Sequence, residues 1–419
     1  MQKIAVIGSG ISGLTIAKLL DDRFDVTVFA KDSKPGGLVK CDRIKDNLFH
    51  RVGGHVFNSR NKEVVDWFWG QFDLEKDFIK AKRNAKILMN DKIIGYPLEN
   101  FLSQLPAETV SMILDDMLAL NRTERSVGEY DNFGEFLLDN FGKTLFKIYF
   151  EPYNNKIWNS DLSKVPLEWL DGKLPMPNLK QMLLSNIVKK EESEMVHATF
   201  YYAKENGSQF IADRLSEGLK IVYDTPVHQL EIQGRVWLVN KELKFDKIVY
   251  TGDVRALASL INIDDTLISK PLDNVRNLRS NGTSNIFCET DVTDISWLYL
   301  PEQNFKAHRI IYTGTFSESN NRGSERMTCV VEFSGKHDFV NMSEEIRRLP
   351  GNLTPLDYNY EPNSYVVQEK DTRVRISEVR NALEPHNLYL LGRFAEWEYY
   401  NMDKAIEAAF QLKEKISGN

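Results

Sequence analysis

The sequence is poor in cysteine. Its three cysteines, Cys41, Cys288 and Cys329, are scattered through 419 residues and form no C-x-x-C pair. An odd number of isolated cysteines argues against a disulfide scaffold and against a zinc site. We therefore predict no metal site and expect a reducing, cytoplasmic location.

The sequence also lacks an excess of positive charge and a long hydrophobic run. Its 53 Lys and Arg against 60 Asp and Glu leave a net charge of -7, so no overall positive field attracts nucleic acid. No run reaches the roughly 18 apolar residues of a membrane helix. We predict a globular protein with no nucleic-acid partner and no membrane span, in which an anionic ligand needs a locally basic pocket.

The first 30 residues have the pattern of a βαβ unit. Residues 3–7 and 25–29 are apolar and predict strands, and residues 12–20 predict a helix between them. Residues 8–13 read Gly-Ser-Gly-Ile-Ser-Gly, which satisfies G-x-G-x-x-G at the turn from strand to helix. This context predicts a dinucleotide whose pyrophosphate lies at the helix N-terminus.

Each glycine of the motif has a physical role. Gly8 permits the tight turn, Gly10 lets the backbone approach the pyrophosphate, and Gly13 lets helix and strand pack closely. Ser12, at the start of the helix, belongs to the predicted cofactor-binding set. A structural glycine turn with no nucleotide is the simpler alternative.

The usual acidic anchor for the adenosine ribose is displaced. The second strand normally ends in Asp or Glu, but here Phe29 is followed by Ala30, Lys31 and Asp32. Either Asp32 reaches the ribose from two positions later or the anchor is absent, and Lys31 leaves NADP open.

Two further features favour FAD. Gly36 and Gly37 follow the second strand, where a long flavin dinucleotide needs close backbone approach. Gly392 and Arg393 follow a late apolar strand, and the helix that begins near Met402 directs its N-terminal N–H groups toward the isoalloxazine carbonyl. A plain turn at Gly392 is the alternative.

The remaining pattern divides the chain into interleaved segments. Residues 98–190 show helical spacing, whereas strand character predominates from 221 to 250 and from 297 to 368. We predict an α/β fold with a Rossmann-type FAD-binding domain, an inserted helical domain and an antiparallel-sheet substrate domain. The predicted domain boundaries are 1–80, 205–265 and 380–419 for FAD binding, 98–200 for the helical domain, and 81–97 and 266–379 for the sheet domain.

Four segments carry a resemblance to a known family. Residues 392–402 read GRFAEWEYYNM and resemble the motif G-R-x-A-E-Y-x-Y-Y-D-M. Residues 53–64 are similar to its G-x-H-I-F-H…N-K segment, residues 153–158 to its Y-x-x-K-Q-W, and residues 308–310 to its T-R-I strand. The chain thus resembles the UDP-galactopyranose mutase family, flavoproteins whose lineage includes amine oxidases and protoporphyrinogen oxidases.

The resemblance implies a reaction without net redox change. In that family, N5 of reduced FAD attacks the anomeric carbon of a UDP-sugar and expels UDP, and the sugar recloses with the other ring size. It implies a flavin-dependent isomerase with a nucleotide-sugar substrate. No Ser/His/Asp or Cys/His constellation in the sequence competes with the cofactor as nucleophile.

The same resemblance assigns residues to the site. Arg309, Tyr399 and Tyr365 meet the diphosphate, and Arg393 lies near flavin and sugar, in keeping with the bidentate contacts that arginine makes with phosphate. His55 lines the flavin face or is a structural histidine. We therefore expect Arg309, Arg393 and His55 to be the catalytic residues.

Further substrate contacts are implied in the helical domain. Tyr153 and Trp158 flank the uridine ring, with core packing as the alternative for both. Where the family has R-I-P-x-R on a mobile loop, residues 173–177 read Lys-Leu-Pro-Met-Pro, so Lys173 replaces one arginine and proline the other. Asn401 replaces the Asp of the motif and is able to cap the following helix.

Two other functions remain open. An FAD oxidoreductase of the amine oxidase or protoporphyrinogen oxidase type uses the same framework and predicts an elongated apolar tunnel. A scaffold that binds flavin or nucleotide without turnover is the third hypothesis. The oligomeric state also remains open, with a homodimer as one arrangement.

Overall fold

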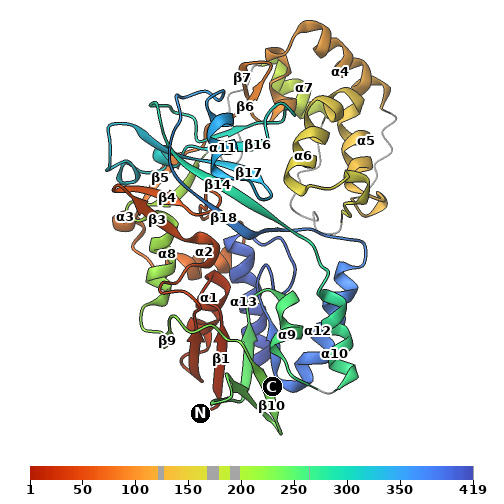
Figure 1. Cartoon of the computed structure of the whole chain (residues 1–419). Coiled ribbons are helices and arrows are strands. Elements are labelled where there is room, and N and C mark those ends of the chain that lie inside the picture. The colour runs from red at the N-terminus through yellow and green to blue at the C-terminus, as the bar shows by residue number, and fades with distance from the viewer. Residues whose placement is uncertain (121–126, 168–178, 189–198, 264, 419) are drawn as a thin grey trace.

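The predicted βαβ unit forms the centre of a parallel sheet. The computed structural model describes residues 1–419 except 121–126, 168–178, 189–198, 264 and 419. Its five-stranded parallel sheet has the order β19-β13-β1-β2-β9 and occupies the lower half of the molecule (Figure 1). The strands are β1 (Lys3–Ile7), β2 (Asp25–Phe29), β9 (Ile221–Val222), β13 (Lys247–Tyr250) and β19 (Leu388–Leu390).

Both faces of this sheet are covered, which explains its continuous apolar strands. Helices α1 (Ile11–Leu20) and α13 (Met402–Ser417) pack on one face, around Val6, Ile16 and Leu412. The other face is covered by a three-stranded sheet and by helices. These elements are β10 (Leu230–Gln233), β11 (Val236–Val239), β12 (Leu243–Phe245), α9 (Leu257–Leu260), α10 (Thr266–Val275) and α12 (Thr372–Leu383).

A seven-stranded sheet forms the second layer, above the first in Figure 1, with the order β18-β14-β17-β16-β15-β6-β7. All its neighbours are antiparallel except β15 and β6. Strands β6 and β7 form a hairpin that turns at Asn90 and Asp91, whose φ angles are 50° and 56°. The strands are β6 (Ala85–Met89), β7 (Lys92–Gly95), β14 (Ser280–Thr290), β15 (Trp297–Tyr299), β16 (Ala307–Ile311), β17 (Met327–Ser334) and β18 (Thr354–Val366).

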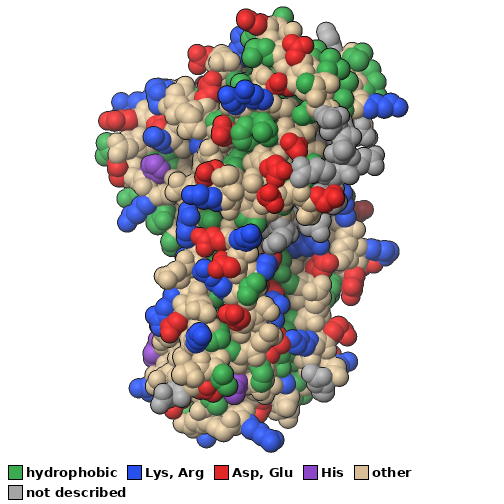
Figure 2. Space-filling view, turned by 90° about the vertical axis from the view of Figure 1, so that its right-hand side faces the viewer, with side chains coloured by type: hydrophobic (Ala, Val, Ile, Leu, Met, Phe, Trp, Pro, Cys, Tyr) green, Lys and Arg blue, Asp and Glu red, His purple; other side chains and the backbone are tan. Residues whose placement is uncertain are grey.

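A helical part lies at the upper right of Figure 1. It contains α4 (Ala107–Ala119), α5 (Phe133–Leu145), a π-helical segment (Phe146–Phe150), α6 (Glu151–Trp158) and α7 (Leu179–Ile187). Apolar side chains gather at the top of the molecule in Figure 2. Among the residues of this helical part, Met112, Leu118 and Ile187 are more than half exposed. Among the described residues, no helix has the length and apolar character needed to cross a membrane.

Shorter elements connect these layers. They are β3 (Cys41–Ile44), β4 (Asn47–His50), α2 (Lys62–Trp69), α3 (Leu74–Asp77), β5 (Phe78–Lys82), β8 (Thr199–Ala203), α8 (Gly207–Ser216) and α11 (Phe339–Ile346). The fold class predicted from the sequence is confirmed: a Rossmann-like α/β unit is combined with helices and a largely antiparallel sheet.

Strand β14 (Ser280–Thr290) lies outside the strand ranges predicted from the sequence. Helix α10 and the first two thirds of α12 lie within 266–379, the range predicted for the sheet domain, and both helices pack in the core beside the parallel sheet. Their apolar residues include Ile268 and Ile376, so burial against that sheet decides their position. The domain boundaries stay a prediction.

Candidate functional site

The first glycine turn is built as the motif requires. Gly8 has φ of +113°, and a Cβ added there would lie 2.3 Å from Oγ1 of Thr251. At Gly13 a Cβ would lie 2.0 Å from the carbonyl oxygen of Gly8. Glycine is therefore needed for the turn and for the close packing of α1 on β1, while Gly10 stands at the N-cap of α1 without a side-chain cap.

The second glycine turn meets the first. The N–H of Gly36 donates to the carbonyl of Ser9 at 2.8 Å, and a Cβ on Gly37 would lie 3.3 Å from Cα of Gly10. Both Gly36 and Gly37 have positive φ. The two turns therefore present bare backbone side by side at the N-terminus of α1.

Asp32 lies just beyond the end of β2, where its carboxylate pairs with Nζ of the buried Lys40. Burial alone would raise the pKa of Asp32, but the hydrogen bond and charge of Lys40 hold that pKa below its ordinary value. The carboxylate is thus ionised and already compensated. Ribose binding by Asp32 stays a prediction.

The loop that follows β19 lies against the start of α1. Gly392 follows β19 with φ of +97°, and a Cβ there would lie 2.6 Å from Oγ of Ser12. Met402 is the first residue of α13, which packs along α1. Asn401 precedes it at the N-cap position, and its side chain makes no cap hydrogen bond. The predicted cofactor residues of both chain ends therefore converge on the start of α1.

A cavity of about 140 Å³ lies beside these turns. It brings together six of the predicted site residues, namely His55, Arg309, Tyr365, Arg393, Tyr399 and Asn401. The remaining lining residues are Leu38, Val52, Gly53, Gly54 and Ser364. Side chains separated by more than 300 positions in the sequence thus share one polar space.

Arg309 is held by a carboxylate that the sequence analysis missed. Its Nε donates to Glu332, and its Nη2 donates to the Tyr365 hydroxyl at 3.1 Å. Glu332 is fully buried and also accepts from the backbone N–H of Gly53 at 2.7 Å. The available signal was one acidic residue within the otherwise uncharged strand β17.

Glu332 and Arg309 are both held in their charged forms. Burial alone would raise the pKa of Glu332, but Arg309 and His308 overcome it and hold that pKa well below its usual range. Burial would lower the pKa of Arg309, yet Glu332 keeps it well above its ordinary value. Burial raises the pKa of the Tyr365 hydroxyl, which therefore stays neutral.

Arg393, also in the cavity lining, is held by backbone carbonyls. It donates from Nε to the carbonyl of Tyr400 at 2.9 Å and from Nη1 to the carbonyl of Ser364 at 3.0 Å. Its guanidinium carbon lies 4.8 Å from the centroid of the Tyr399 ring. Three backbone bonds, including a second to Tyr400, leave two of the five guanidinium N–H groups for a ligand.

Aromatic rings connect the cavity to the helical part. Tyr365 and Tyr399 stack with centroids 5.9 Å apart and planes 6° apart, and Trp158 meets both rings edge-on. Tyr153 meets Tyr299 edge-on at 5.6 Å and does not line the cavity. Uridine contacts by Tyr153 and Trp158 stay predictions, because packing accounts for both positions. Lys173 lies outside the described residues.

His55 lies against the same cavity. Burial and the nearby charge of Arg393 lower its pKa to about 4, so its imidazole is neutral at pH 7. Its Nε2 is buried and has no hydrogen-bond partner among the described residues. A buried polar atom without a partner is typical of a position that a ligand occupies, and the hydrogen-bonding edge of a flavin would provide such a partner for His55 Nε2.

The glycine turns and the parallel sheet define a class of protein, those built on a Rossmann-like domain. Residues 6–72 match the family model of the NAD(P)-binding Rossmann-like domain. Beyond this domain the chain resembles proteins named as mutases.

A probable UDP-galactopyranose mutase of Klebsiella pneumoniae is 23% identical over 269 residues, which cover 61% of this chain and 69% of that protein. A dTDP-fucopyranose mutase of Escherichia coli is 26% identical over 170 residues, covering 40% and 44%. A solved structure of reduced UDP-galactopyranose mutase superposes with a TM-score of 0.87 at 18% identity, over 100% of this chain and 94% of that one. The resemblance to UDP-galactopyranose mutases indicated by the sequence motifs is confirmed, and the fold is shared.

Proposed function

We propose that the protein is an FAD-dependent nucleotide-sugar mutase that interconverts the pyranose and furanose forms of a UDP-sugar. The observation that carries the proposal is the cavity itself. It joins two fixed cations, Arg309 and Arg393, two phenols, Tyr365 and Tyr399, and the neutral His55. Cations and neutral hydroxyls converging on a small space suit a sugar diphosphate.

The cofactor residues proposed to hold FAD share bare or close backbone at the start of α1. They are Gly8, Gly10, Ser12, Gly13, Gly36, Gly37, Gly392 and Met402, with Asp32 on the ribose. When bound and reduced, FAD supplies the nucleophile for the anomeric carbon. His55 offers Nε2 to the flavin edge without adding charge, because its pKa is about 4.

The chain's own residues hold the diphosphate through the reaction. Because Glu332 fixes one side of the Arg309 guanidinium, the other side is oriented before the substrate arrives. Tyr365 stays protonated and donates a hydrogen bond, and Arg393 keeps two N–H groups for the sugar side. Retaining the departed diphosphate within this donor set allows it to recombine with the rearranged sugar.

The cavity is too small to enclose a whole nucleotide-sugar, so such a substrate would extend beyond it. At about 140 Å³ it is smaller than the ligand sites of roughly 300–1,000 Å³ that enclose a drug-sized molecule. The reacting sugar and diphosphate occupy the cavity, and the nucleoside extends toward Tyr153 and Trp158. The polar lining favours this reading over the oxidase hypothesis, which required an elongated apolar tunnel.

The test is conversion of a sugar ring by the reduced holoenzyme. The purified protein is loaded with FAD, reduced with dithionite and incubated separately with UDP-galactofuranose and dTDP-fucofuranose. Ring isomers are separated by chromatography. Conversion of the UDP-sugar supports the proposal. Flavin binding without conversion of either sugar contradicts it and favours the scaffold hypothesis, whereas reduction of oxidised flavin by an amine or a porphyrinogen favours the oxidase hypothesis.

A further inference from the structure

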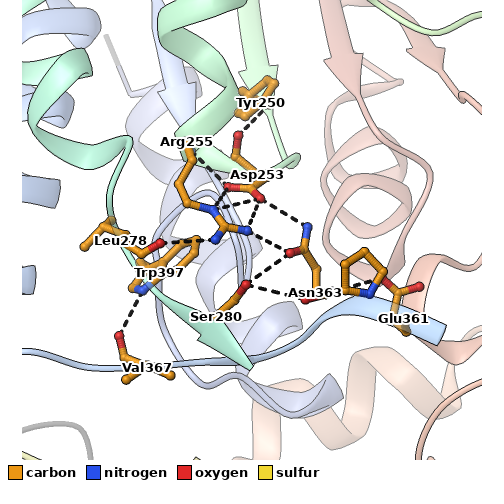
Figure 3. A network of polar contacts seen from close by, with 10 residues as sticks. Tyr250, Asp253, Arg255, Leu278, Ser280, Glu361, Asn363, Val367 and Trp397 are labelled. Atoms are coloured by element: carbon orange, nitrogen blue, oxygen red, sulfur yellow. Dashed lines mark hydrogen bonds and ion pairs between the residues drawn. The ribbon is translucent and has the colours of Figure 1, made fainter. Parts of the chain in front are cut away.

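A ring of polar contacts centred on Arg255 joins the residues after β13 to strands β14 and β18 (Figure 3). Arg255 lies just after β13, and its guanidinium grips Asp253 with Nε at 3.0 Å and 3.1 Å from the two carboxylate oxygens. Nη2 of Arg255 donates to Oδ1 of Asn363 at 2.8 Å, and Nδ2 of Asn363 donates to Asp253 at 3.1 Å. The three side chains therefore close a ring between the parallel sheet and β18.

The same guanidinium supports a second element. Its carbon lies 4.8 Å from the ring centroid of Trp397, which is fully buried in the loop between β19 and α13. Trp397 has φ of +52°, a left-handed conformation that a bulky side chain adopts only where its surroundings impose it. The indole N–H donates to the carbonyl of Val367 at 3.2 Å, and the Trp397 carbonyl accepts from Gln368 at 2.5 Å.

Both supported segments lead directly into the cavity. Asn363 is followed by Ser364 and Tyr365, which line it, and Trp397 is followed two residues later by Tyr399, which also lines it. Tyr365 and Tyr399 stack on each other in the lining of the cavity. Arg255 thus touches the immediate supports of both stacked rings, although it does not itself line the cavity.

We propose that Arg255 is a positioning residue for the cavity. Through Asn363 on one side and Trp397 on the other, it sets the separation of Tyr365 and Tyr399 and so the placement of the diphosphate between Arg309 and Arg393. The assignment rests on the proposed function. The Arg255 guanidinium bonds Asp253 and Asn363 through its planar set of N–H groups and stacks its flat face on Trp397. Lysine has neither feature, so it cannot replace Arg255.

The experiment compares Arg255→Lys and Asn363→Ala with a matched control in the FAD-loaded protein. The control is Arg276→Gln, because Arg276 also pairs with an aspartate close in sequence, Asp273 at 2.8 Å, and its contacts reach no cavity residue. Flavin content, the dissociation constant of UDP, and kcat and KM are measured. A displacement on the order of 1 Å lowers kcat/KM about 100-fold.

The expected result is normal flavin content in all three variants, with weaker UDP binding and lower kcat in Arg255→Lys and Asn363→Ala alone. Wild-type UDP affinity and kinetics in Arg255→Lys would overturn the proposal, as would loss of flavin from that variant. Crystal structures of the Arg255→Lys variant and of the parent protein test the positioning role without any turnover, so its failure is distinguishable from failure of the proposed function. An unchanged Tyr365–Tyr399 stack contradicts the positioning role even if no sugar is ever converted.

Discussion

Arg309 and Glu332 face each other on the adjacent antiparallel strands β16 and β17, and the guanidinium donates directly to the carboxylate. Both groups are charged, and Glu332 is completely buried. The backbone N–H of Gly53 satisfies the second carboxylate oxygen at 2.7 Å. This pair therefore ties the sheet to the loop that carries His55 and fixes the position of Arg309, the cation that we propose to bind the diphosphate.

Replacing Glu332 with Gln should destabilise the fold. The amide keeps the shape but leaves Arg309 without its counter-charge in a buried setting, and breaking a buried pair in this way costs about 3–5 kcal/mol. The free energy of unfolding is measured by urea denaturation. Glu205→Gln, which breaks the exposed ion pair with Arg322, is the control and should leave stability nearly unchanged. Equal effects of the two substitutions would refute the assignment.

Replacing Arg309 with Lys should impair the reaction while leaving flavin bound. Lysine keeps one charge but cannot bond Glu332, Tyr365 and a phosphate together, because it lacks the planar fork. Loss of one hydrogen bond to a charged group, worth about 1.5–3 kcal/mol, corresponds to a fall in kcat/KM of roughly 10- to 150-fold. Steady-state kinetics with a UDP-sugar measure the fall in kcat/KM, and the flavin absorption spectrum shows whether flavin stays bound. A lysine variant with full activity would show that Arg309 makes no bidentate contact.

The local parts of this architecture were predictable from the sequence. The turn containing Gly8 and Gly13 and the hairpin at Asn90 and Asp91 follow from short-range steric rules, so a few adjacent residues identify them. The contact between Gly36 and Ser9 is also short-range in this sense, because the two residues follow β2 and β1, which are adjacent strands. Resemblance to a family then indicated Arg309, Tyr365, Arg393 and Tyr399 as one site.

Features that depend on distant pairing were not predictable. Glu332 gains its role only when β17 is aligned with β16, and 23 residues separate it from Arg309. Strand β14 is polar in sequence, but it is covered by β17 and β18 on its two edges, and this pairing overrides its weak strand preference. Trp397 likewise takes its left-handed conformation from contacts with Val367 and Arg255.

The free energy of unfolding should fall as the pH is lowered from about 6.5 toward 5. Burial is the main cause that lowers the pKa of His55 to about 4 and that of His50 to about 3, whereas the same groups in the unfolded chain titrate near 6.5. The unfolded state therefore binds more protons in this window, and each histidine contributes a slope of up to about 1.4 kcal/mol per pH unit.

Urea denaturation at several pH values measures this slope. His55→Gln should reduce it by up to one proton, whereas His228→Gln, which changes an exposed histidine, should not. If the His55→Gln slope equals that of the parent, the imidazole is not held neutral by burial.

Replacing Gly392 with Ala should weaken both the fold and flavin binding. The methyl group meets a left-handed backbone with φ of +97° and would lie 2.6 Å from Oγ of Ser12, so the loop that follows β19 must move away from the start of α1. Gly218→Ala is the matched control, because Gly218 has φ of +81° with no atom within 4 Å of the added carbon.

The control isolates the backbone penalty, about 1–2 kcal/mol for a non-glycine residue at positive φ. Gly392→Ala should exceed it and should also lower the flavin content of the purified protein, measured by absorbance after release. Since Gly218 lies outside the cofactor site, its variant should keep full flavin content. Equal losses in the two variants would mean that the contact between Gly392 and Ser12 does not shape the cofactor site.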